Sequence, residues 1–341
     1  MPHLLINSKF PPSAAEQLRT IPGLKVSFTG LAAAEHHGPV AFPLELACDA
    51  DIIVTSDPPQ DFAEMTSLKF IQLASVGYAQ LYGLDVVSRG IRVANARGVY
   101  DSAIGEWNLG MMIALARDLR QMIRNQERGH WEKAPRFANE LRSQTVGVWG
   151  YGGIGRETAR LAKAIGMTVH AYARGGIKPR GETYTAPGTG DVQGALPDKV
   201  FLQGQEQEFL SGLDFLILAM PLTPQSKGLI GTAELRALKP TAYVLNPARG
   251  PLIQEEALLT ALRENQIAGA ALDTHYHYPM PADHPLWQFP NVIMTPHISG
   301  SDLGPLFVDR MLEITEHNVR QFLAGRALWN ELTADELAGK G

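Results

Sequence analysis

The stretch TVGVWGYGGIGRETARLAKAIGMTVHAYAR, from Thr145 to Arg174, decides the fold. An apolar run is followed by a glycine-rich turn, then by a segment with helical spacing of apolar residues, and then by a second apolar run. All four parts fit within ~30 residues, the length of one strand–helix–strand unit of a dinucleotide-binding domain. Their order predicts such a unit here.

Three glycines in this stretch form a G-x-G-x-x-G motif between the first strand and the helix. Gly150 permits a tight turn, Gly152 lets the backbone approach a pyrophosphate, and Gly155 lets the helix pack on the strand. The helix N-terminus, with Gly153 and Ile154, offers N–H groups and the positive end of the helix dipole to the phosphates. We predict that these five residues bind a dinucleotide; the alternative is a glycine-rich turn that binds nothing.

The end of the second strand indicates which dinucleotide is bound. An NAD-binding protein places an acid there, hydrogen-bonded to the ribose 2′-hydroxyl. This chain has Ala173 and Arg174 instead, with Lys178 and Arg180 close behind. Arg174 can hold a 2′-phosphate with two parallel hydrogen bonds, whereas an acid would repel it. We predict NADP(H) as the cofactor, with NAD possible if Arg174 faces solvent.

Apolar runs of strand length alternate with helical segments along most of the chain. They lack the apolar–polar alternation of a half-exposed strand, as expected of parallel strands buried on both faces. The runs are Asp51–Thr55, Phe70–Ala74, Ile91–Asn95, Thr145–Gly150, Thr168–Ala173, Asp214–Ala219, Ala242–Asn246, Gly269–Asp273 and Asn291–Thr295. This order predicts an α/β protein with doubly wound parallel sheets.

The domain organisation follows from two interruptions of this alternation. The apolar segment Ser102–Gly129 predicts one long helix buried between domains. We predict a Rossmann NAD(P)-binding domain of residues 104–302, inserted into a flavodoxin-like substrate domain of residues 1–103 plus 303–341. The Gly- and Pro-rich segment Gly175–Lys199 is too long for an ordinary connection and predicts a lid or a short extra hairpin.

The composition excludes several classes of function. The 341 residues are 45% hydrophobic and 19% charged, a normal globular balance for two domains. A net charge of −5 argues against binding to nucleic acid or to an acidic membrane. No apolar run reaches the ~18 residues of a membrane span, and the start of the chain lacks a signal-peptide pattern. Because Cys48 is the only cysteine, we expect a reducing compartment, the cytoplasm.

Further motifs accompany the glycine-rich stretch, and together they resemble the D-isomer-specific 2-hydroxyacid dehydrogenase family. The resemblance covers about Phe70 to Leu323. Its motifs are LASVGYAQL, VANARGVYDSAIGEWNLGMMIALAR, the glycine-rich fingerprint, LAMPLTPQSKGLI, VLNPARGPLIQEEALLTAL, GAALDT and TPHISGS. It implies an NAD(P)-dependent homodimer whose active site lies in the cleft between the cofactor domain and the substrate domain.

The resemblance also implies roles for single residues in the substrate site. Arg249, in NPARG, resembles the arginine that holds the substrate carboxylate and carbonyl, a task that suits a planar guanidinium. Val76 and Gly77 resemble the turn whose backbone N–H groups bind that carboxylate. His297, in TPHISG, resembles the proton donor to the substrate carbonyl, because the pKa of histidine lies near neutrality.

Other positions resemble the residues of the family that line the cofactor. Asp273 resembles the acid near the nicotinamide amide. The remaining ones follow predicted strands and are Met220, Pro221, Pro247, Ala248, Ser299 and Gly300.

The chain departs from the family at the residue that assists the catalytic histidine. The family has a glutamate just before a proline there, and alignment on Asp273 and Pro279 places Tyr278 at this position. Formate dehydrogenases of the same superfamily also lack this glutamate. The Tyr278 hydroxyl can orient the imidazole of His297 but supplies no charge at pH 7. We therefore expect a lower pKa for His297 than in relatives with the glutamate; alternatively, Tyr278 only packs.

The histidines around Tyr278 raise the question of a metal site. His275 and His277 are two residues apart, so in an extended segment they face the same side. We expect no metal, because no cysteine or acid nearby completes a tetrahedral set and hydride transfer needs none. The segment His275–His277 is expected to line the cleft, and His284 to cap or pack the loop.

These features predict an NADP(H)-dependent oxidoreductase that moves a hydride between nicotinamide and C2 of a small 2-oxo or D-2-hydroxy acid, such as glyoxylate or hydroxypyruvate. Two alternatives remain: an oxidation of the formate-dehydrogenase type, and a noncatalytic scaffold that senses NAD(P). Arg249 and His297 argue against the scaffold, whereas Tyr278 favours it.

Overall fold

The computed structural model describes residues 1–341 except 8–9, 30–43, 60–61, 182, 301–303 and 340–341. The chain divides into two compact units, which are described separately below. Unit 1 comprises Met1–Tyr100, Gly181–Ala186 and Asp302–Gly341, and unit 2 comprises Asp101–Arg180 and Pro187–Ser301. Unit 2 is therefore inserted into unit 1 along the sequence. The short segment Gly181–Ala186 belongs to unit 1, although both of its neighbours in the sequence belong to unit 2.

Unit 1 is built on a parallel sheet that has five strands within the described residues, in the order β2-β1-β3-β4-β5. This is the flavodoxin-like order of a doubly wound sheet. The strands are β1 (His3–Asn7), β2 (Lys25–Phe28), β3 (Ile52–Thr55), β4 (Phe70–Leu73) and β5 (Arg92–Ala94). The helices are α1 (Pro12–Arg19), α2 (Leu44–Ala47), α9 (Pro305–Leu323) and α10 (Ala334–Leu337).

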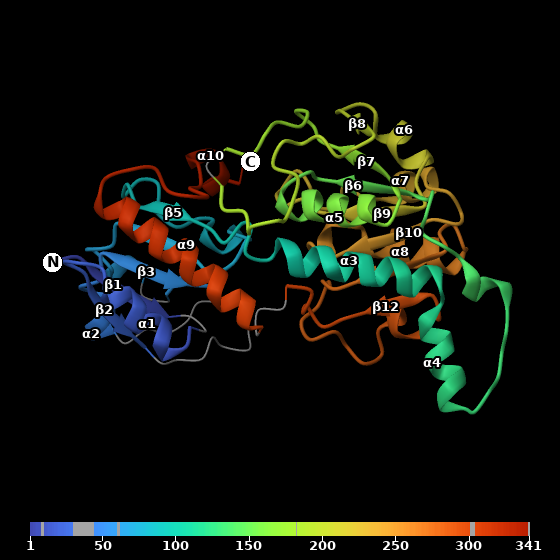
Figure 1. Ribbon diagram of the computed structural model, residues 1–341, viewed down its shortest axis with the longest axis horizontal. Coiled ribbons are helices and arrows are strands. Elements are labelled where there is room, and N and C mark those ends of the chain that lie inside the picture. Colours follow the sequence, from blue (N-terminus) through green and yellow to red (C-terminus); the bar gives the residue numbers. More distant parts are fainter. Residues whose placement is uncertain (8–9, 30–43, 60–61, 182, 301–303, 340–341) are drawn as a thin grey trace. The chain divides into compact units, whose positions relative to one another are not determined.

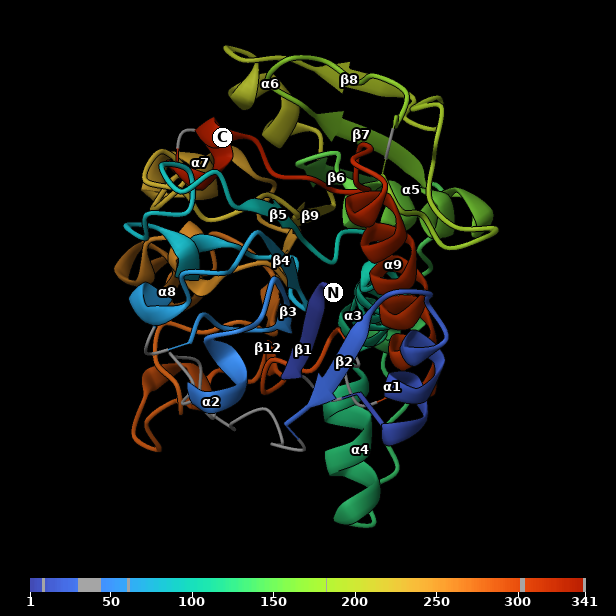
Figure 2. The same cartoon turned by 90° about the vertical axis from the view of Figure 1, so that its left-hand side faces the viewer.

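Successive residues of these strands enter two different cores, since side chains alternate across a sheet. Ile52 and Val54 pack in the core beneath α1 and α9, whereas Ile53 packs in the core on the α2 side. Figure 2 shows α1 and α9 on one side of the sheet and α2 on the other. Burial on both faces explains why the strand sequences are continuously apolar.

Unit 2 is built on a parallel sheet that has seven strands in the described part of the chain, in the order β12-β11-β10-β9-β6-β7-β8. The strands are β6 (Thr145–Trp149), β7 (Thr168–Tyr172), β8 (Lys199–Phe201), β9 (Phe215–Leu218), β10 (Tyr243–Asn246), β11 (Gly269–Leu272) and β12 (Val292–Met294). The helices are α3 (Asp101–Ala116), α4 (Leu119–Glu127), α5 (Gly153–Ala164), α6 (Glu206–Ser211), α7 (Thr232–Ala237) and α8 (Glu255–Arg263). The strand order reverses between β6 and β9, where a Rossmann sheet binds its ligand.

The helices of unit 2 cover both faces of its sheet. Residues of α3 and α5 share one core with the sheet, and residues of α6, α7 and α8 share the other (Figure 1). The predicted α/β fold with doubly wound parallel sheets is therefore confirmed.

The predicted single helix over Ser102–Gly129 is wrong. Helix α3 ends at Ala116 and α4 begins at Leu119, because Asp118 adopts a left-handed conformation with φ 46°. Helix α3 is buried against α5, whereas α4 and the segment after it extend away from the sheet of unit 2 (Figure 1). The continuous apolar composition hid this break in the helix.

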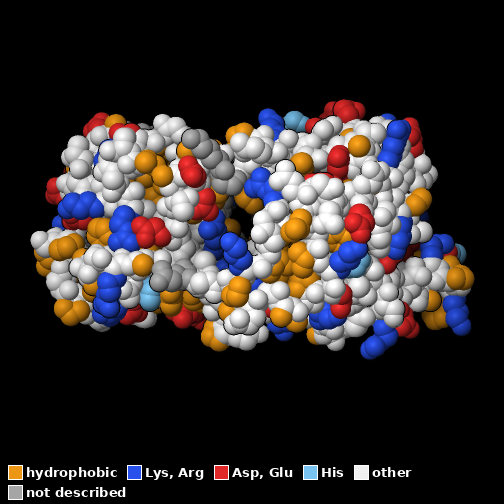
Figure 3. Space-filling view, turned by 90° about the horizontal axis from the view of Figure 1, so that it is seen from above, with side chains coloured by type: hydrophobic (Ala, Val, Ile, Leu, Met, Phe, Trp, Pro, Cys, Tyr) orange, Lys and Arg blue, Asp and Glu red, His pale blue; other side chains and the backbone are white. Residues whose placement is uncertain are grey.

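The surface carries both signs of charge. In Figure 3, Lys and Arg side chains are interspersed with Asp and Glu side chains on each unit, in line with the small net charge of −5. No helix within the described ranges is both long and apolar enough to cross a bilayer.

Candidate active site

The predicted site residues of unit 2 gather at one edge of its sheet. Gly150 follows β6, Arg174 follows β7, Arg249 follows β10 and His297 follows β12. Because these strands are parallel, their carboxyl ends meet at the same edge, and ligands of open α/β sheets bind there. The same edge receives the other predicted cofactor-lining residues, which are Met220, Pro221, Pro247, Ala248, Ser299 and Gly300.

The turn from β6 to α5 needs its glycines for steric reasons. Gly150 has φ 98°, and a Cβ there would come within 2.8 Å of the backbone of Ala219. A Cβ on Gly155 would collide with the carbonyl oxygen of Gly150. The N–H of Arg156 donates the first bond of the helical turn, to the carbonyl of Gly152 at 3.0 Å. The N–H groups before it have no acceptor inside the helix and can face a pyrophosphate.

A carboxylate that no sequence motif marks lies beside this turn. Asp101, the first residue of α3, is buried, and a Cβ on Gly153 would collide with its carboxylate. Arg180 forms an ion pair with Asp101 at 3.2 Å, and both side chains are largely buried. The guanidinium of Arg180 is therefore held by Asp101 beside the start of α5. No motif in the sequence links these two residues, which are 79 positions apart.

Arg174 lies just after the end of β7, and its predicted contact with a 2′-phosphate stays a prediction. Its side chain is exposed, and within the described residues no carboxylate forms an ion pair with it. Glu206, at the start of α6, accepts a hydrogen bond from the Tyr172 hydroxyl at 2.5 Å and one from the N–H of Gly204 at 3.0 Å. Thus Arg174 is free to meet an anion.

The segment Gly175–Lys199 is held against the glycine-rich turn. Asp191 accepts hydrogen bonds from the Tyr151 hydroxyl at 2.8 Å and from the N–H groups of Gly194, Ala195 and Leu196, each at 3.0 Å. Arg156 donates to the carbonyls of Tyr151, Lys178 and Asp191. Before β8 the described part of the segment has no strand, so the hairpin alternative is wrong.

Asp273, which follows β11, fixes the loop that carries His297. Its carboxylate accepts hydrogen bonds from the Thr295 hydroxyl, the Ile298 N–H, and both the N–H and the hydroxyl of Ser299, all between 2.5 and 3.0 Å. The side chain is completely buried. The hydrogen-bond partners of Asp273 thus belong to the loop after β12. That Asp273 also lies near the nicotinamide amide stays a prediction.

His297 is held in a conformation that non-glycine residues rarely adopt. Its φ is 57°, and its N–H donates to the carbonyls of Asp273 at 2.8 Å and Thr295 at 3.0 Å. Backbone strain of this kind persists only where surrounding bonds impose it, which is common at functional sites. The rigid loop therefore sets where the imidazole stands.

Tyr278 lies beside His297, as its predicted role requires. The two ring centroids are 5.6 Å apart, and the Tyr278 hydroxyl accepts a hydrogen bond from the N–H of His275 at 3.1 Å. Half of the Tyr278 side chain is exposed, but burial of its hydroxyl raises the pKa above the usual value of 10. Tyr278 is therefore neutral at physiological pH.

Arg249 completes this group. Its backbone N–H donates to the Asn246 side chain at 3.2 Å, and its guanidinium donates to the carbonyl of Ala248 at 2.7 Å. Burial lowers the pKa of the guanidinium, which also interacts electrostatically with Tyr278. No described carboxylate forms an ion pair with Arg249. A desolvated cation without a counterion is suited to bind an anion.

Val76 and Gly77 lie in unit 1, after β4. Their carbonyls accept bonds from Asn95 at 2.8 Å and from Ser75 at 2.8 Å. Within the described residues, their N–H groups have no acceptor. Such N–H groups suit an anion, but their role toward the substrate carboxylate stays a prediction.

The histidines after β11 do not share one side, because the chain bends there. His275 is buried and donates from Nε2 to the Thr295 carbonyl at 2.8 Å. His284 accepts a bond from the N–H of Leu286 and so caps the short helix η5 (Pro285–Gln288), as expected. The expectation that no acid lies near these histidines is wrong, since Glu255 from α8 lies beside His277 and His284.

Residues 109–299, more than half of the chain, match the model of the D-isomer specific 2-hydroxyacid dehydrogenase, NAD binding domain. The chain belongs to the D-isomer specific 2-hydroxyacid dehydrogenase family. The predicted family, NAD(P) cofactor and enzyme class are thereby confirmed.

Relatives of this dehydrogenase family cover most of the chain. A glyoxylate reductase of Thermofilum pendens is 33% identical over 263 residues, which cover 76% of this chain and 73% of that protein. A crystal structure of a D-isomer specific 2-hydroxyacid dehydrogenase family protein from Aeromonas salmonicida has 26% identity and a TM-score of 0.79, covering 97% of this chain and 99% of that one. The NADPH-dependent glyoxylate/hydroxypyruvate reductase of Sinorhizobium meliloti, in complex with NADP and sulfate, has 21% identity and a TM-score of 0.76, covering 99% and 100%.

Proposed function

We propose that this dehydrogenase uses NADP(H) and acts on a small 2-oxo acid, such as glyoxylate or hydroxypyruvate, or on the corresponding D-2-hydroxy acid. The observation that carries the proposal is the group formed by Arg249, Tyr278 and His297. It combines a desolvated cation for a carboxylate with an imidazole on a rigid loop. Glyoxylate is also the substrate named for the 33%-identical relative.

When bound, the nicotinamide supplies or takes up the hydride. Arg249 holds the substrate carboxylate and the carbonyl oxygen with its planar donors. His297 donates a proton to the carbonyl oxygen during reduction and accepts it back during oxidation. The neutral Tyr278 ring borders the imidazole and limits how it can rotate.

The proposed preference for NADP(H) depends on Arg174. Its exposed guanidinium can form two hydrogen bonds to the 2′-phosphate. A solved relative of the same fold binds NADP. The glycine-rich turn would bind the pyrophosphate of either cofactor.

A homodimer is part of the proposal. Helix α4 and the segment after it expose Leu119, Ile123 and Trp131, the last of which is 93% exposed. Apolar side chains of this size gathered on one projecting element favour burial against a second copy. The single cysteine favours a reducing compartment such as the cytoplasm.

A panel of 2-oxo acids tests the proposed function. Each acid is offered with NADPH and with NADH, and the loss of absorbance of the reduced cofactor is followed; formate with NADP+ and NAD+ is included. We expect turnover with small 2-oxo acids and NADPH, and its loss in His297→Asn. Turnover of formate alone would replace the proposal with the formate-dehydrogenase type. Tight NADPH binding without any turnover would favour the scaffold instead.

A further inference from the structure

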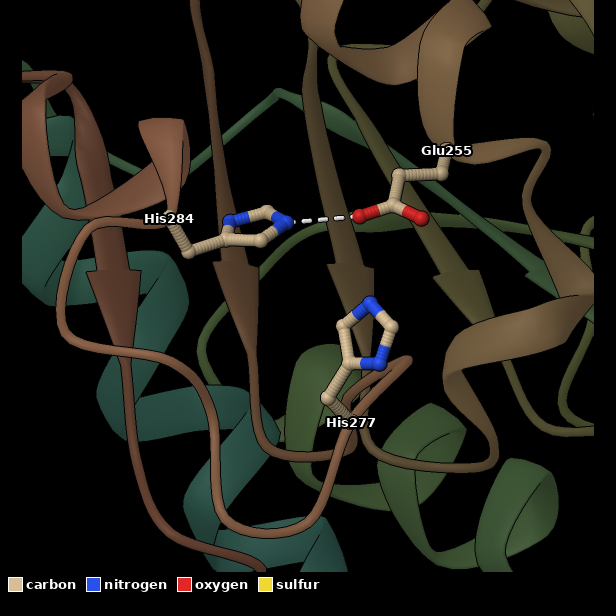
Figure 4. A group of neighbouring side chains, drawn as sticks. All are labelled: Glu255, His277 and His284. Atoms are coloured by element: carbon tan, nitrogen blue, oxygen red, sulfur yellow. Dashed lines mark hydrogen bonds and ion pairs between the residues drawn. The ribbon is translucent and has the colours of Figure 1, made fainter.

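Three potential metal ligands from two separate segments meet in unit 2. Glu255 is the first residue of α8, and His277 and His284 lie in the loop between β11 and η5. One ligand atom of each lies within 4.8 Å of those of the other two. In Figure 4, a ring nitrogen of His277 points into the space beside the dashed bond between His284 and Glu255.

The three side chains differ in exposure in a way that suits a cation arriving from solvent. His284 is buried, Glu255 is partly buried, and His277 is exposed. The buried imidazole of His284 and the carboxylate of Glu255, which is carried by α8, are held in place. The exposed imidazole of His277 can adjust its position. A cation can therefore enter past His277.

We propose that Glu255, His277 and His284 bind a divalent transition-metal cation, with Zn²⁺ as the best match. Two imidazole nitrogens and one carboxylate oxygen are ligands that Zn²⁺ accepts, with a water in the fourth tetrahedral position. A hard cation such as Mg²⁺ prefers oxygen ligands and is a poor match.

A hydrogen bond competes with the cation at this site. His284 donates from Nε2 to Glu255 at 2.6 Å and accepts at Nδ1 from the Leu286 N–H at 3.2 Å. Metal binding uses the Nε2 lone pair, so the ring proton moves to Nδ1 and the bond from Leu286 is lost. Two hydrogen bonds, one of them the short bond between His284 and Glu255, are exchanged for three coordinate bonds. We therefore expect binding that is specific but weaker than at a site whose imidazole tautomer is already suitable.

The bound cation would link the loop after β11, through His277 and His284, to α8, through Glu255. This loop also carries Tyr278, next to His297. The expected role is to stabilise the loop, because the proposed hydride transfer needs no metal.

The test uses the full-length protein without an affinity tag, stripped with a chelator. Zn²⁺ is titrated in competition with a chromophoric chelator, and Co²⁺ binding is followed by visible absorption. We expect one Zn²⁺ per chain and the intense Co²⁺ bands of four-coordinate geometry. His277→Ala should weaken Zn²⁺ binding at least about 100-fold, since changes to outer partners alone cost 10–100-fold. Zn²⁺ should raise the Tm of the parent protein but not that of His277→Ala.

Two further variants keep the proposal falsifiable. Glu255→Gln should also weaken Zn²⁺ binding, and the exposed His130, outside the cluster, provides the control His130→Ala, which should bind like the parent. Because His277 is exposed, its replacement by alanine should leave the fold intact. Equal Zn²⁺ binding by the parent protein and His277→Ala would refute the site, as would only the weak Co²⁺ absorption of an octahedral, water-rich complex.

Discussion

At the scale of single residues, Arg249 is a desolvated cation with no described carboxylate partner in an ion pair. Arg249→Lys keeps the charge but loses the planar fork that grips a carboxylate. We expect kcat/KM for a 2-oxo acid to fall at least about 100-fold, which is ~2.7 kcal/mol of transition-state stabilisation. NADPH binding, followed by fluorescence, should be unchanged.

The exposed Arg236 on α7 provides a matched control for this change. Arg236→Lys should keep full activity. If Arg249→Lys retains both turnover and cofactor affinity, Arg249 does not hold the carboxylate.

Tyr278 and His297 give a prediction for the pH dependence. Reduction needs the imidazolium as proton donor, so its rate should decline as the pH rises through the pKa of His297. Burial raises the pKa of Tyr278 above 10, so this side chain stays neutral over the assay range and contributes no charge. Tyr278→Glu places an anion beside the imidazolium and should move the decline upward by about 1 pH unit or more.

Tyr278→Phe serves as the comparison. It should leave the position of the decline nearly unchanged while lowering kcat if the hydroxyl orients the ring. The measurement is kcat/KM for reduction between pH 5 and 9. A parent rate that stays flat to high pH, with chemistry rate-limiting, would point to a different proton donor.

Arg174 gives the prediction for cofactor choice. The parent protein should use NADPH at least about tenfold better than NADH in kcat/KM, or ~1.4 kcal/mol, a modest demand on one charged bidentate contact. Arg174→Ala should remove most of this difference, and Arg174→Lys should retain part of it because the charge remains. Equal efficiency of the parent with both cofactors would disprove the preference.

At the scale of elements, Asp191 ties the segment Gly175–Lys199 to the β6–α5 turn. Burial by itself would raise its pKa, but bonds from the N–H groups of Leu196, Ala195 and Gly194 and from the Tyr151 hydroxyl outweigh this and lower it below 3.8. Asp191→Asn replaces an acceptor oxygen with an NH₂ group. We expect a loss of about 1–3 kcal/mol in the free energy of unfolding and a higher KM for NADPH.

The sign of the pH dependence follows from this lowered pKa. The folded state binds the proton of Asp191 less readily than the unfolded state does. The ionised Asp191 side chain therefore stabilises the folded state fully above pH 3.8, the pKa of the carboxyl in the unfolded chain. This stabilisation is lost as the pH falls through the lower pKa that the carboxyl has in the folded state. The difference in urea midpoint between parent and Asp191→Asn should shrink in that range. Asp309→Asn, an exposed site on α9, should show no difference at any pH.

At the scale of the whole molecule, the exposed apolar residues of α4 and its following segment predict the assembly state. Sedimentation equilibrium should give twice the 37.1 kDa mass of one chain. The double variant Ile123→Asp and Trp131→Glu should shift the protein toward monomer, since it places charges on the proposed contact. Val87→Asp, at an exposed apolar site of unit 1, should stay dimeric. A parent protein of single-chain mass would rule out the dimer.

The amino-acid sequence by itself determined the elements whose apolar character is continuous. Strands β3 to β7 and β9 to β12 were predictable because parallel strands buried on both faces need unbroken apolar runs. Three strands were missed. Strand β2 is only partly buried and two of the three residues of β8 are exposed, so neither carries that signal. Strand β1 was missed although all five of its residues are buried. The glycine turn was predictable because its motif is local, with strand, glycines and helix adjacent in the chain.

Only the tertiary structure decided which distant side chains meet. Asp101 pairs with Arg180, Glu255 approaches His277 and His284, and Asp273 fixes the loop of His297. Nothing in the local sequence marks these pairs, because the parallel sheet brings together strand ends that are far apart in the chain. The break at Asp118 was likewise hidden, since apolar composition reports burial but not a single left-handed residue. Local patterns thus determine strands, helices and the phosphate turn, whereas partners of charged groups depend on the folded topology.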